Sequence, residues 1–218
     1  MQINSTNRTN IPYLIGITGG FGTGKSLTGE ILKETGVTVV DTDEIVKNIL
    51  NTKNNITEKI QNEFGDTVVN KTESDYINKK FLAQIVFNYE DKRKKLELII
   101  HPEVNKVLDT FISQNKDKDI VAVLIPLLFE AGRESFFDEI WCVKCNSEVQ
   151  FERLIKKGFT PEEIKARINS QLPIETKVKK STFVIDNSGS IDETKEQVIS
   201  RLKKLVQSNH SLHLSLDR

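Results

Sequence analysis

The sequence lacks a surplus of charge of either sign. Its 31 lysines and arginines are balanced by 31 aspartates and glutamates, so the formal net charge at pH 7 is zero. A chain without net positive charge exerts no long-range attraction on nucleic acid or on an anionic membrane surface. The balance therefore argues against a polyanion-binding protein, and we expect no nucleic-acid, membrane or obligate protein partner.

Long apolar runs are missing as well. No stretch approaches the roughly 20 apolar residues that a bilayer-spanning helix needs. Residues 1–10 are polar and contain no apolar segment of the kind found in signal peptides. We therefore predict a disordered leader at 1–10, a flexible tail at 208–218 and a cytoplasmic location. The 218 residues suit one large α/β domain with insertions and are too few for two such domains.

Cysteine is scarce, and Cys142 and Cys145 are the only two. They form a C-x-x-C pattern, but the segment 140–145 predicts a strand rather than the helix start that a redox pair requires. Strand side chains three residues apart point to opposite faces, so the two thiols cannot easily bridge. A zinc site would need two more ligands, and no histidine lies at zinc-finger spacing from the pair. We expect reduced cysteines that fill the core.

Short apolar runs alternate with helical patterns along the chain. A strand followed by a helix and another strand favours a parallel sheet with helices on both faces. The sequence therefore predicts a three-layer α/β/α fold with a parallel five-stranded sheet. The predicted strands are 13–18, 37–40, 120–125, 138–144 and 182–185, and the predicted helices include 25–35, 148–157, one capped by Thr160 with Pro161 and Glu163, and 192–206.

Two insertions interrupt this alternation. Residues 44–118 have helical periodicity and few strand signals, and residues 151–180 are basic, with eight lysines and arginines against four glutamates. We predict that both insertions are helical.

The segment Gly19–Ser26 fits the pattern G-x-x-x-x-G-K-[ST] at every fixed position, between a predicted strand and a predicted helix. Its glycines let backbone N–H groups curl around a phosphate, and the helix that follows adds its N-terminal dipole. In such loops the lysine, here Lys25, bridges the β- and γ-phosphates, and the hydroxyl of Ser26 ligates Mg²⁺. The loop predicts a nucleotide-binding protein that uses ATP and Mg²⁺.

A nucleotide loop does not name the acceptor, and the rival class is a GTPase switch. A GTPase would need the pattern D-x-x-G followed by the guanine-reading pattern N-K-x-D. Asp186–Gly189 fits the first pattern but lies near the C-terminus with no guanine-reading pattern after it. Asn115–Lys118 resembles the second pattern, but its aspartate stands one position too early. The strand 121–125 has no aspartate to ligate the metal. Small-molecule kinases are therefore favoured, and adenylate-like and shikimate-like kinases remain alternatives of the same class.

Further segments resemble one family, dephospho-CoA kinase, in that family's order over about 13–207. The most specific are the runs P-L-L-F-E and I-D-N-S-G, which are rarer than the phosphate loop. The matching segments are Ile15–Gly20, Val39–Ile45, Phe64–Gly65, Ile100–Pro102, Ile125–Glu130 and Val184–Gly189, with Gln150, Arg153, Ala166–Ile168 and Gln171 between them.

The resemblance implies that ATP phosphorylates the ribose 3′-hydroxyl of dephospho-coenzyme A, the last step of coenzyme A synthesis. It also implies a P-loop core, a helical substrate domain and a mobile lid. The expected division is 11–43, 119–150 and 181–207 for the nucleotide-binding core, 44–118 for the substrate domain and 151–180 for the lid. A basic lid suits phosphoryl transfer, which needs cations and the exclusion of water.

The resemblance also implies roles for individual residues. Lys25, Asp43 and Arg153 are expected to be catalytic, and Ser26 is the expected Mg²⁺ ligand. Dephospho-coenzyme A is expected at Asp43, Lys79, His101 and Arg167. ATP is expected at Gly20, Gly22, Thr23, Gly24, Lys25, Ser26, Leu27, Arg153 and Asn187, the last of these bordering the adenine.

Some of these roles have a structural alternative. Asp43 could accept the proton of the 3′-hydroxyl, or it could cap the helix that follows it. Asp41 is expected to be structural or to lie near Mg²⁺. His101, before Pro102, could be a packed turn residue, and Arg153 and Arg167 could be solvated helix charges.

The chain departs from the family pattern at several positions. Leu27 stands where the family usually has threonine, so only its backbone N–H can meet a phosphate. Lys157 and Gly158 stand where the lid usually has an Arg-Asp or similar pair, so one residue is missing and lysine replaces the arginine; lysine offers a point charge instead of a bidentate fork. Asn78-Lys79 and Ser181-Thr182 also differ from the family's usual residues.

Overall fold

The computed structural model describes residues 11–70, 76–209 and 212. The predicted leader 1–10 and most of the predicted tail lie outside the described residues. The chain forms two compact units, one from 1–40 and 114–218 and the other from 41–113. The bounds of the second unit, 41–113, are close to those predicted for the helical insertion, 44–118.

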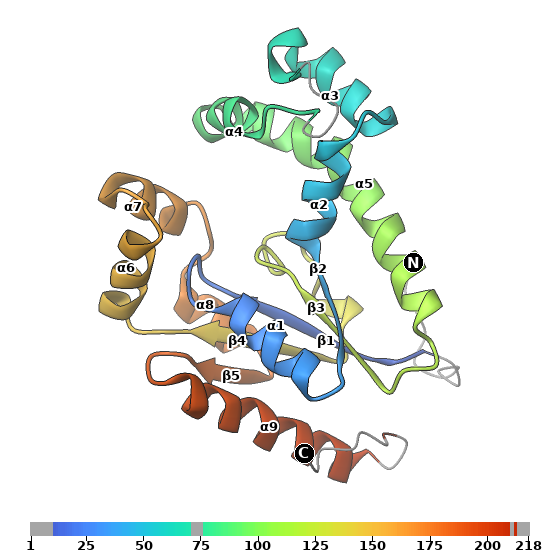
Figure 1. The fold of residues 1–218 in the computed structure, drawn as a ribbon, viewed down its shortest axis with the longest axis vertical. Coiled ribbons are helices and arrows are strands. Elements are labelled where there is room, and N and C mark those ends of the chain that lie inside the picture. Colours follow the sequence, from blue (N-terminus) through green and yellow to red (C-terminus); the bar gives the residue numbers. More distant parts are fainter. Residues whose placement is uncertain (1–10, 71–75, 210–211, 213–218) are drawn as a thin grey trace. The chain divides into compact units, whose positions relative to one another are not determined.

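The first unit is built on a sheet of five strands among the described residues (Figure 1). The strand order is β2-β3-β1-β4-β5, and the pairs β1–β3, β1–β4 and β4–β5 are parallel. The predicted α/β fold with a parallel five-stranded sheet is confirmed. The strands are β1 (Tyr13–Gly19), β2 (Thr38–Asp41), β3 (Ile120–Leu124), β4 (Glu139–Lys144) and β5 (Phe183–Asp186).

The helices of the first unit begin at residues that favour helix starts. Thr160 and Ser190 each accept a hydrogen bond from the third helical residue, a glutamate whose side chain bonds back to the cap. The start predicted at Thr160 is therefore confirmed. The helices are α1 (Lys25–Glu34), α6 (Ser147–Lys156), α7 (Pro161–Asn169), α8 (Ile174–Lys180) and α9 (Ile191–Ser208), with the 3₁₀ helix η2 at Glu134–Phe136.

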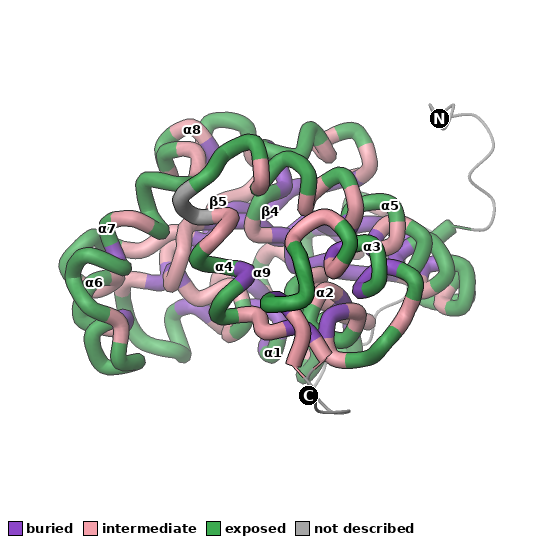
Figure 2. The backbone as a smooth tube through the Cα atoms, turned by 90° about the horizontal axis from the view of Figure 1, so that it is seen from above, coloured by how far each residue is buried: buried purple, intermediate pink, exposed green. Residues whose placement is uncertain are grey.

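Helices cover both faces of the sheet because its side chains alternate in direction. On one face, Ile15 and Ile17 of β1 lie in one buried cluster with Leu32 of α1 and Leu202 of α9. On the other face, α8 contacts β1 and β4. Buried positions concentrate in the central strands, whereas α6 and α7 are mostly exposed (Figure 2).

The second unit is helical, as predicted for the first insertion. Asn54 caps α3 by accepting from the backbone N–H groups of Ile56 and Thr57. Glu63 joins α3 to α5 by accepting from Lys92 and Lys95. The elements are α2 (Thr42–Asn51), α3 (Asn55–Phe64), the 3₁₀ helix η1 (Asp66–Val68), α4 (Lys79–Asn88) and α5 (Glu90–Gln114).

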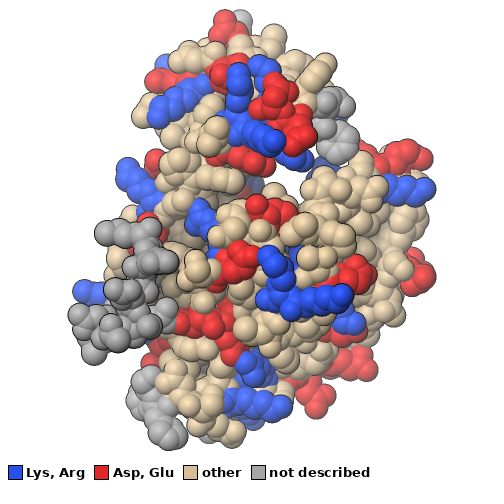
Figure 3. Space-filling view, turned by 180° about the vertical axis from the view of Figure 1, so that it is seen from behind, with Lys and Arg blue, Asp and Glu red and all other residues tan. Residues whose placement is uncertain are grey.

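The charges of the surface are mixed. On the face shown in Figure 3, acidic and basic side chains lie next to one another rather than in separate areas of one sign. None of the described helices combines the length and apolar composition that crossing a membrane requires. At the C-terminal side of α9, Leu212 is buried in the main apolar cluster.

Candidate active site

The glycine-rich segment connects β1 directly to α1, which is the context that the sequence predicted for a phosphate loop. Gly24 has a φ of 107° and is the N-cap of α1. A Cβ at this position would lie 1.9 Å from Nδ2 of Asn187, so both the backbone angle and the space require glycine. Gly19 is equally confined, because a Cβ there would lie 2.2 Å from the backbone oxygen of Val143.

The N-terminus of α1 is suited to an anion. Its first turn has no acidic residue, and glycine at the N-cap brings no side chain to cap the first N–H groups. The ammonium of Lys25 lies over the loop and donates to the carbonyl oxygens of Gly19 at 3.2 Å and Gly20 at 2.8 Å. Ser26 follows it and is exposed. Positive charge, backbone donors and a hydroxyl therefore lie together at the carboxyl end of β1.

Thr23 and Leu27 anchor the two sides of this loop. The buried hydroxyl of Thr23 donates to the carbonyl oxygen of Gly20 at 3.0 Å, which closes the loop on itself. The side chain of Leu27 lies against the main apolar cluster. The departure from threonine at position 27 thus gives α1 an additional core contact, and it leaves the backbone N–H as the only group of Leu27 for a phosphate.

Helix α6 lies against the loop. Nε2 of Gln150 donates to the carbonyl oxygen of Phe21 at 2.5 Å, and a Cβ on Gly22 would lie 2.7 Å from Cδ2 of Leu154. Nη1 of Arg153 donates to the carbonyl oxygen of Asn187 at 2.7 Å. Arg153 is therefore held at the loop rather than solvated on the outside of the helix, and Gln150 is a contact to which the sequence alone assigned no role.

Asn187 follows β5 and is 2% exposed. Its Nδ2 donates to the carbonyl oxygen of Thr23 at 2.8 Å, and its Oδ1 accepts from the hydroxyl of Thr194 at 2.9 Å. Its backbone N–H donates to the carbonyl oxygen of Lys144 at 2.8 Å. The structure thus places Asn187 against the phosphate loop.

Arg167 on α7 contacts two aromatic rings. Its guanidinium carbon lies 5.0 Å from the ring centre of Phe21 in the loop and 5.0 Å from that of Phe159 before α7. The two rings meet edge to face with their centres 5.2 Å apart. This stack joins the predicted lid to the loop. The sequence did not indicate it, because Phe21 is far in the chain from Phe159 and Arg167.

The second unit contains Asp41 and Asp43 at the start of α2. Asp41 is the N-cap of α2, and its Oδ1 accepts from the backbone N–H of Asp43 at 2.9 Å. Asp43 is the second residue of the helix and is exposed. The alternative in which Asp43 caps the helix is therefore wrong, since Asp41 already occupies the cap position.

Two further predicted substrate-binding residues also lie in the second unit. Lys79, the first residue of α4, donates to Oδ1 of Asn51 at the last residue of α2. Asp43 and Asn51 are eight residues apart on α2, a rise of about 12 Å, so Lys79 and Asp43 lie near opposite ends of that helix. His101 is exposed within the long helix α5, and the alternative of a packed turn histidine is wrong.

A buried lysine was missed by the sequence analysis. Lys177 on α8 is 0% exposed, and its ammonium donates to the carbonyl oxygen of Pro126 and pairs with Glu130, both at 2.8 Å. Glu130 also accepts from the backbone N–H of Leu172 at 2.9 Å. The only signal in the sequence is the position of Lys177 three residues after Ile174, on the same side of a short helix.

The turn after β5 is fixed by charge. Ser188 donates its hydroxyl and its backbone N–H to Oδ1 of Asp186, and Lys144 lies 2.9 Å from Oδ2. These contacts, with the Ser188 hydroxyl first, hold the pKa of Asp186 below its ordinary value. Asp186 therefore stays ionised and orders the segment that contains Asn187.

The prediction of reduced cysteines that fill the core is confirmed for Cys142, whereas Cys145 is only partly buried. Both are free, with Cys142 buried in β4 and Cys145 directly after the strand. Burial raises the pKa of the Cys142 thiol from 9.0 to about 11, against the smaller opposing effects of Lys177 and Lys25. Burial also raises the pKa of Cys145. Neither thiol is activated.

The side chains of the loop fit a metal ion that arrives with a nucleotide. No group of three or more His, Cys, Asp or Glu gathers to hold a metal among the residues described. Mg²⁺ is commonly bound by one or two protein oxygens together with phosphates and water. The exposed hydroxyl of Ser26 can supply one such oxygen.

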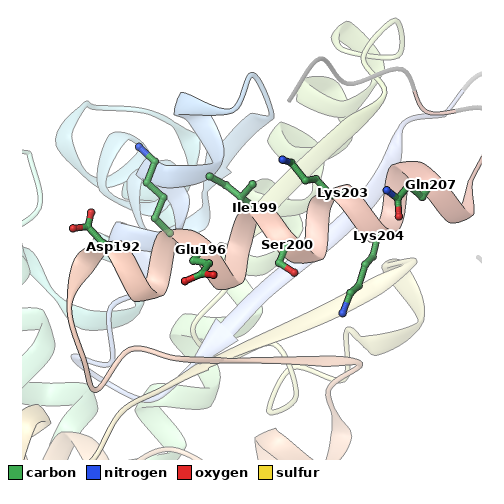
Figure 4. A pocket seen from close by; sticks show the side chains of 8 residues that line it. Asp192, Glu196, Ile199, Ser200, Lys203, Lys204 and Gln207 are labelled. Atoms are coloured by element: carbon green, nitrogen blue, oxygen red, sulfur yellow. The ribbon is translucent and has the colours of Figure 1, made fainter. Parts of the chain in front are cut away.

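A shallow hollow runs along the outer face of α9 (Figure 4). Its lining comes from α9 alone and mixes acidic Asp192 and Glu196 with basic Lys203 and Lys204. None of the predicted site residues contributes to it. The hollow has no concentration of one charge that would attract a nucleotide.

Comparison with known proteins identifies the family of this chain. The model of the dephospho-CoA kinase family matches residues 13–193. The dephospho-CoA kinase of Carboxydothermus hydrogenoformans is 41% identical over 194 residues, covering 88% of this chain and 93% of that protein.

Two solved structures are also similar over most of their length. TT1252 from Thermus thermophilus has a TM-score of 0.78 at 32% identity, covering 91% of this chain and 98% of that one. The dephospho-CoA kinase of Campylobacter jejuni has a TM-score of 0.66 at 28% identity, covering 90% and 98%.

The match spans the phosphate loop, the second unit, α6 to α8 and the turn after β5. It therefore includes both insertions as well as the nucleotide-binding core. The chain belongs to the dephospho-CoA kinase family.

Proposed function

We propose that this chain transfers the γ-phosphoryl group of ATP to the ribose 3′-hydroxyl of dephospho-coenzyme A, giving coenzyme A and ADP. The observation that carries the proposal is the phosphate loop between β1 and α1 in a chain of this family. The expected alternatives of the same class, adenylate-like and shikimate-like kinases, would use the same loop with another acceptor.

The loop supplies the groups that phosphoryl transfer needs. Backbone N–H groups at the start of α1 would hold the β-phosphate, and Lys25 would exchange its loop carbonyls for β- and γ-phosphate oxygens. Arg153 and Arg167 would add positive charge, which stabilises the charge spread over the transferring phosphoryl group. Arg153 is already fixed by Asn187, so little ordering remains for it on binding.

Ser26 would hold Mg²⁺ through its hydroxyl, together with oxygens of the nucleotide. The metal would neutralise the negative charge between the β- and γ-phosphates. Leu27 and Thr23 would contribute through the backbone, since the side chain of Leu27 packs in the core and the hydroxyl of Thr23 closes the loop.

Asp43 would act as the general base. As the hydroxyl oxygen forms its bond to the γ-phosphorus, the proton passes to the carboxylate of Asp43 and the β–γ bridging oxygen leaves with ADP. Asp43 is exposed in the first turn of α2, and Asp41 rather than Asp43 is the N-cap of that helix. Lys79 and His101 would bind other parts of dephospho-coenzyme A.

An ADP-release assay with separate acceptors tests the proposal. Dephospho-coenzyme A, AMP and shikimate are offered in turn with ATP and Mg²⁺, and the expected result is rapid ADP release with dephospho-coenzyme A alone. Faster ADP release with AMP or shikimate than with dephospho-coenzyme A would indicate an adenylate-like or shikimate-like kinase instead. ADP release that no acceptor accelerates would overturn the proposed reaction.

A further inference from the structure

Asn187 makes contacts to four separate parts of the first unit. Its side chain bonds to Thr23 of the phosphate loop and Thr194 of α9, and its backbone bonds to Lys144 of β4 and Arg153 of α6. All four distances lie between 2.7 and 2.9 Å. A surface residue that merely borders a ligand does not need such connections.

The orientation of the side-chain amide is set by its two partners. A carbonyl oxygen can only accept, so the group facing Thr23 must be the NH₂ of Asn187. The hydroxyl of Thr194 can then donate to Oδ1. Because Asn187 is 2% exposed, both polar atoms depend on these partners rather than on water.

The bond to Thr23 fixes one peptide of the loop. In a trans peptide the carbonyl and the following N–H point in opposite directions. Holding the carbonyl of Thr23 against Asn187 therefore directs the N–H of Gly24 to the other side of that peptide. Gly24 is the N-cap of α1, so this N–H belongs to the group of donors at the start of the helix.

We propose that Asn187 is a positioning residue that holds the Thr23–Gly24 peptide in its phosphate-binding orientation, with Thr194 fixing the amide of Asn187. The inference rests on the proposed function, because it assigns the loop to a triphosphate. It differs from a role for the Asn187 side chain in reading adenine. We call the bonds from Asn187 to Thr23 and Thr194 the Asn187 clamp. The Asn187 clamp affects the binding of the phosphates of any nucleotide, whereas a side chain that binds the base would distinguish one base from another.

Calorimetric binding of three ligands separates these roles. ATP, GTP and inorganic tripolyphosphate, each with Mg²⁺, are titrated into the unsubstituted protein and into Asn187→Leu, which keeps the branched shape of the side chain but removes both of its hydrogen bonds. We expect the affinity for all three ligands to fall by the same factor, about tenfold to a hundredfold, the usual effect of leaving a buried acceptor unpaired. The ratio of the ATP and GTP affinities stays unchanged.

Thr194 provides a matched pair of controls at a site on α9. Thr194→Val removes the hydroxyl but keeps the shape, and we expect it to weaken all three ligands by a common, smaller factor. Thr194→Ser keeps the hydroxyl and retains the binding of the unsubstituted protein. The melting temperature of each variant shows that binding is measured on folded protein, and the Thr194 pair decides the question if Asn187→Leu does not fold.

Two results would contradict the proposed positioning role of Asn187. One is unchanged tripolyphosphate binding by Asn187→Leu together with an altered ratio of ATP to GTP affinity, which indicates a base reader. The other is equal binding by Thr194→Val and Thr194→Ser. Failure of the unsubstituted protein to bind any of the three ligands would instead overturn the proposed function, and this inference with it.

Discussion

Asp41 and Asp43 are separated by one residue but differ in what their carboxylates contact. Asp41 ends β2 and caps α2 through the backbone N–H of Asp43. Asp43 lies inside the first turn, where a carboxylate is favoured by the helix dipole and remains exposed. Asp41 therefore orders the strand-to-helix connection, whereas Asp43 is an exposed residue of the first helical turn.

Replacing Asp43 with Asn tests its proposed role as the base. The substitution keeps the size but removes the charge and basicity, so we expect kcat to fall by about 10²- to 10⁴-fold, the usual range for general base catalysis. The nucleotide Kd should change little, because the loop groups proposed to hold the phosphates, Lys25 and the N–H groups at the start of α1, are unaltered. The melting temperature should stay near that of the unsubstituted protein, because Asp41 remains the cap.

Glu44→Gln is the matched control for this change. Glu44 is the next residue, is exposed and pairs with Lys47, and its substitution removes the same charge. Its turnover should stay close to that of the unsubstituted protein. If Asp43→Asn turned over within a few-fold of the unsubstituted protein, or no more slowly than Glu44→Gln, the base would have to be another group.

Cys142 predicts a specific dependence of stability on pH. Its pKa is raised from 9.0 to about 11 by burial, so above pH 9 the unfolded chain loses this proton while the folded chain retains it. The unfolded state then binds fewer protons, and stability falls as the pH rises from 9 to 11. Two pKa units correspond to about 2.7 kcal/mol, an order-of-magnitude value.

Urea denaturation of Cys142→Ala and of the unsubstituted protein between pH 8 and pH 11 measures this effect. The variant loses some packing energy at every pH, but the difference in unfolding free energy between the two proteins should shrink as the pH rises. A difference that stays constant across this range would show that the thiol ionises equally in the folded and unfolded states.

At the scale of elements, α8 is fixed to the segment that follows β3. The ammonium of Lys177 joins Pro126 and Glu130, and Glu130 in turn accepts from Leu172 just before α8. The carbonyl oxygen of Pro126 also accepts from the hydroxyl of Thr18 at 3.3 Å. These bonds connect the end of the predicted lid to β1 immediately before the phosphate loop.

Lys177→Met should therefore be strongly destabilising. Removing the ammonium leaves the carbonyl oxygen of Pro126 and the partly exposed carboxylate of Glu130 without this partner, and an unpaired buried polar group typically costs about 1–3 kcal/mol. Lys179→Met is the matched control, because Lys179 is exposed on the same helix and substitutions at such sites usually change stability by less than about 0.5 kcal/mol. Chemical denaturation of both variants makes the comparison. Equal stability of the two would mean that the buried pair contributes nothing beyond a surface lysine.

If the basic segment 151–180 is a lid, bound nucleotide should protect it from cleavage by trypsin. Lys156, the last residue of α6, and Lys157, its C-cap, are exposed and precede Gly158. If ATP and Mg²⁺ draw the basic segment over the phosphates, the entropy of ordering it is offset by those contacts, and trypsin cleavage after Lys156 and Lys157 should slow.

The connection between α5 and β3 serves as an internal control for that experiment. Lys116 and Lys118 are also exposed, but they precede β3 and so lie at the opposite end of the parallel strands from the phosphate loop. Cleavage there should proceed at the same rate with and without nucleotide. Equal protection at both connections would indicate general stabilisation instead of a closing lid.

For the molecule as a whole, local signals predicted the elements well. Apolar runs located the strands, the box at Thr160 located the start of α7, and the glycines with Lys25 located the phosphate loop. Each of these depends on neighbours in the sequence, because a cap or a turn is decided within a few residues.

The contacts that the sequence did not predict join distant parts of the chain. The stack of Arg167 on Phe21 and Phe159, and the bonds of Asn187 to Thr23 and Thr194, depend on how the sheet brings segments together. No spacing rule gives such contacts. The family pattern pointed to Asn187 and Arg167 as positions of interest, but the partners of these residues required the structure.

The central claim is that the loop after β1 activates ATP for transfer to one hydroxyl group. The most direct test is the rate of ADP release with dephospho-coenzyme A and with its 3′-deoxy analogue, measured for the unsubstituted protein and for Lys25→Ala. We predict rapid release with dephospho-coenzyme A only, and a fall in kcat of at least about a hundredfold in Lys25→Ala, equivalent to about 2.7 kcal/mol of barrier. Comparable rates with the 3′-deoxy analogue, or near-normal turnover by Lys25→Ala, would contradict the claim.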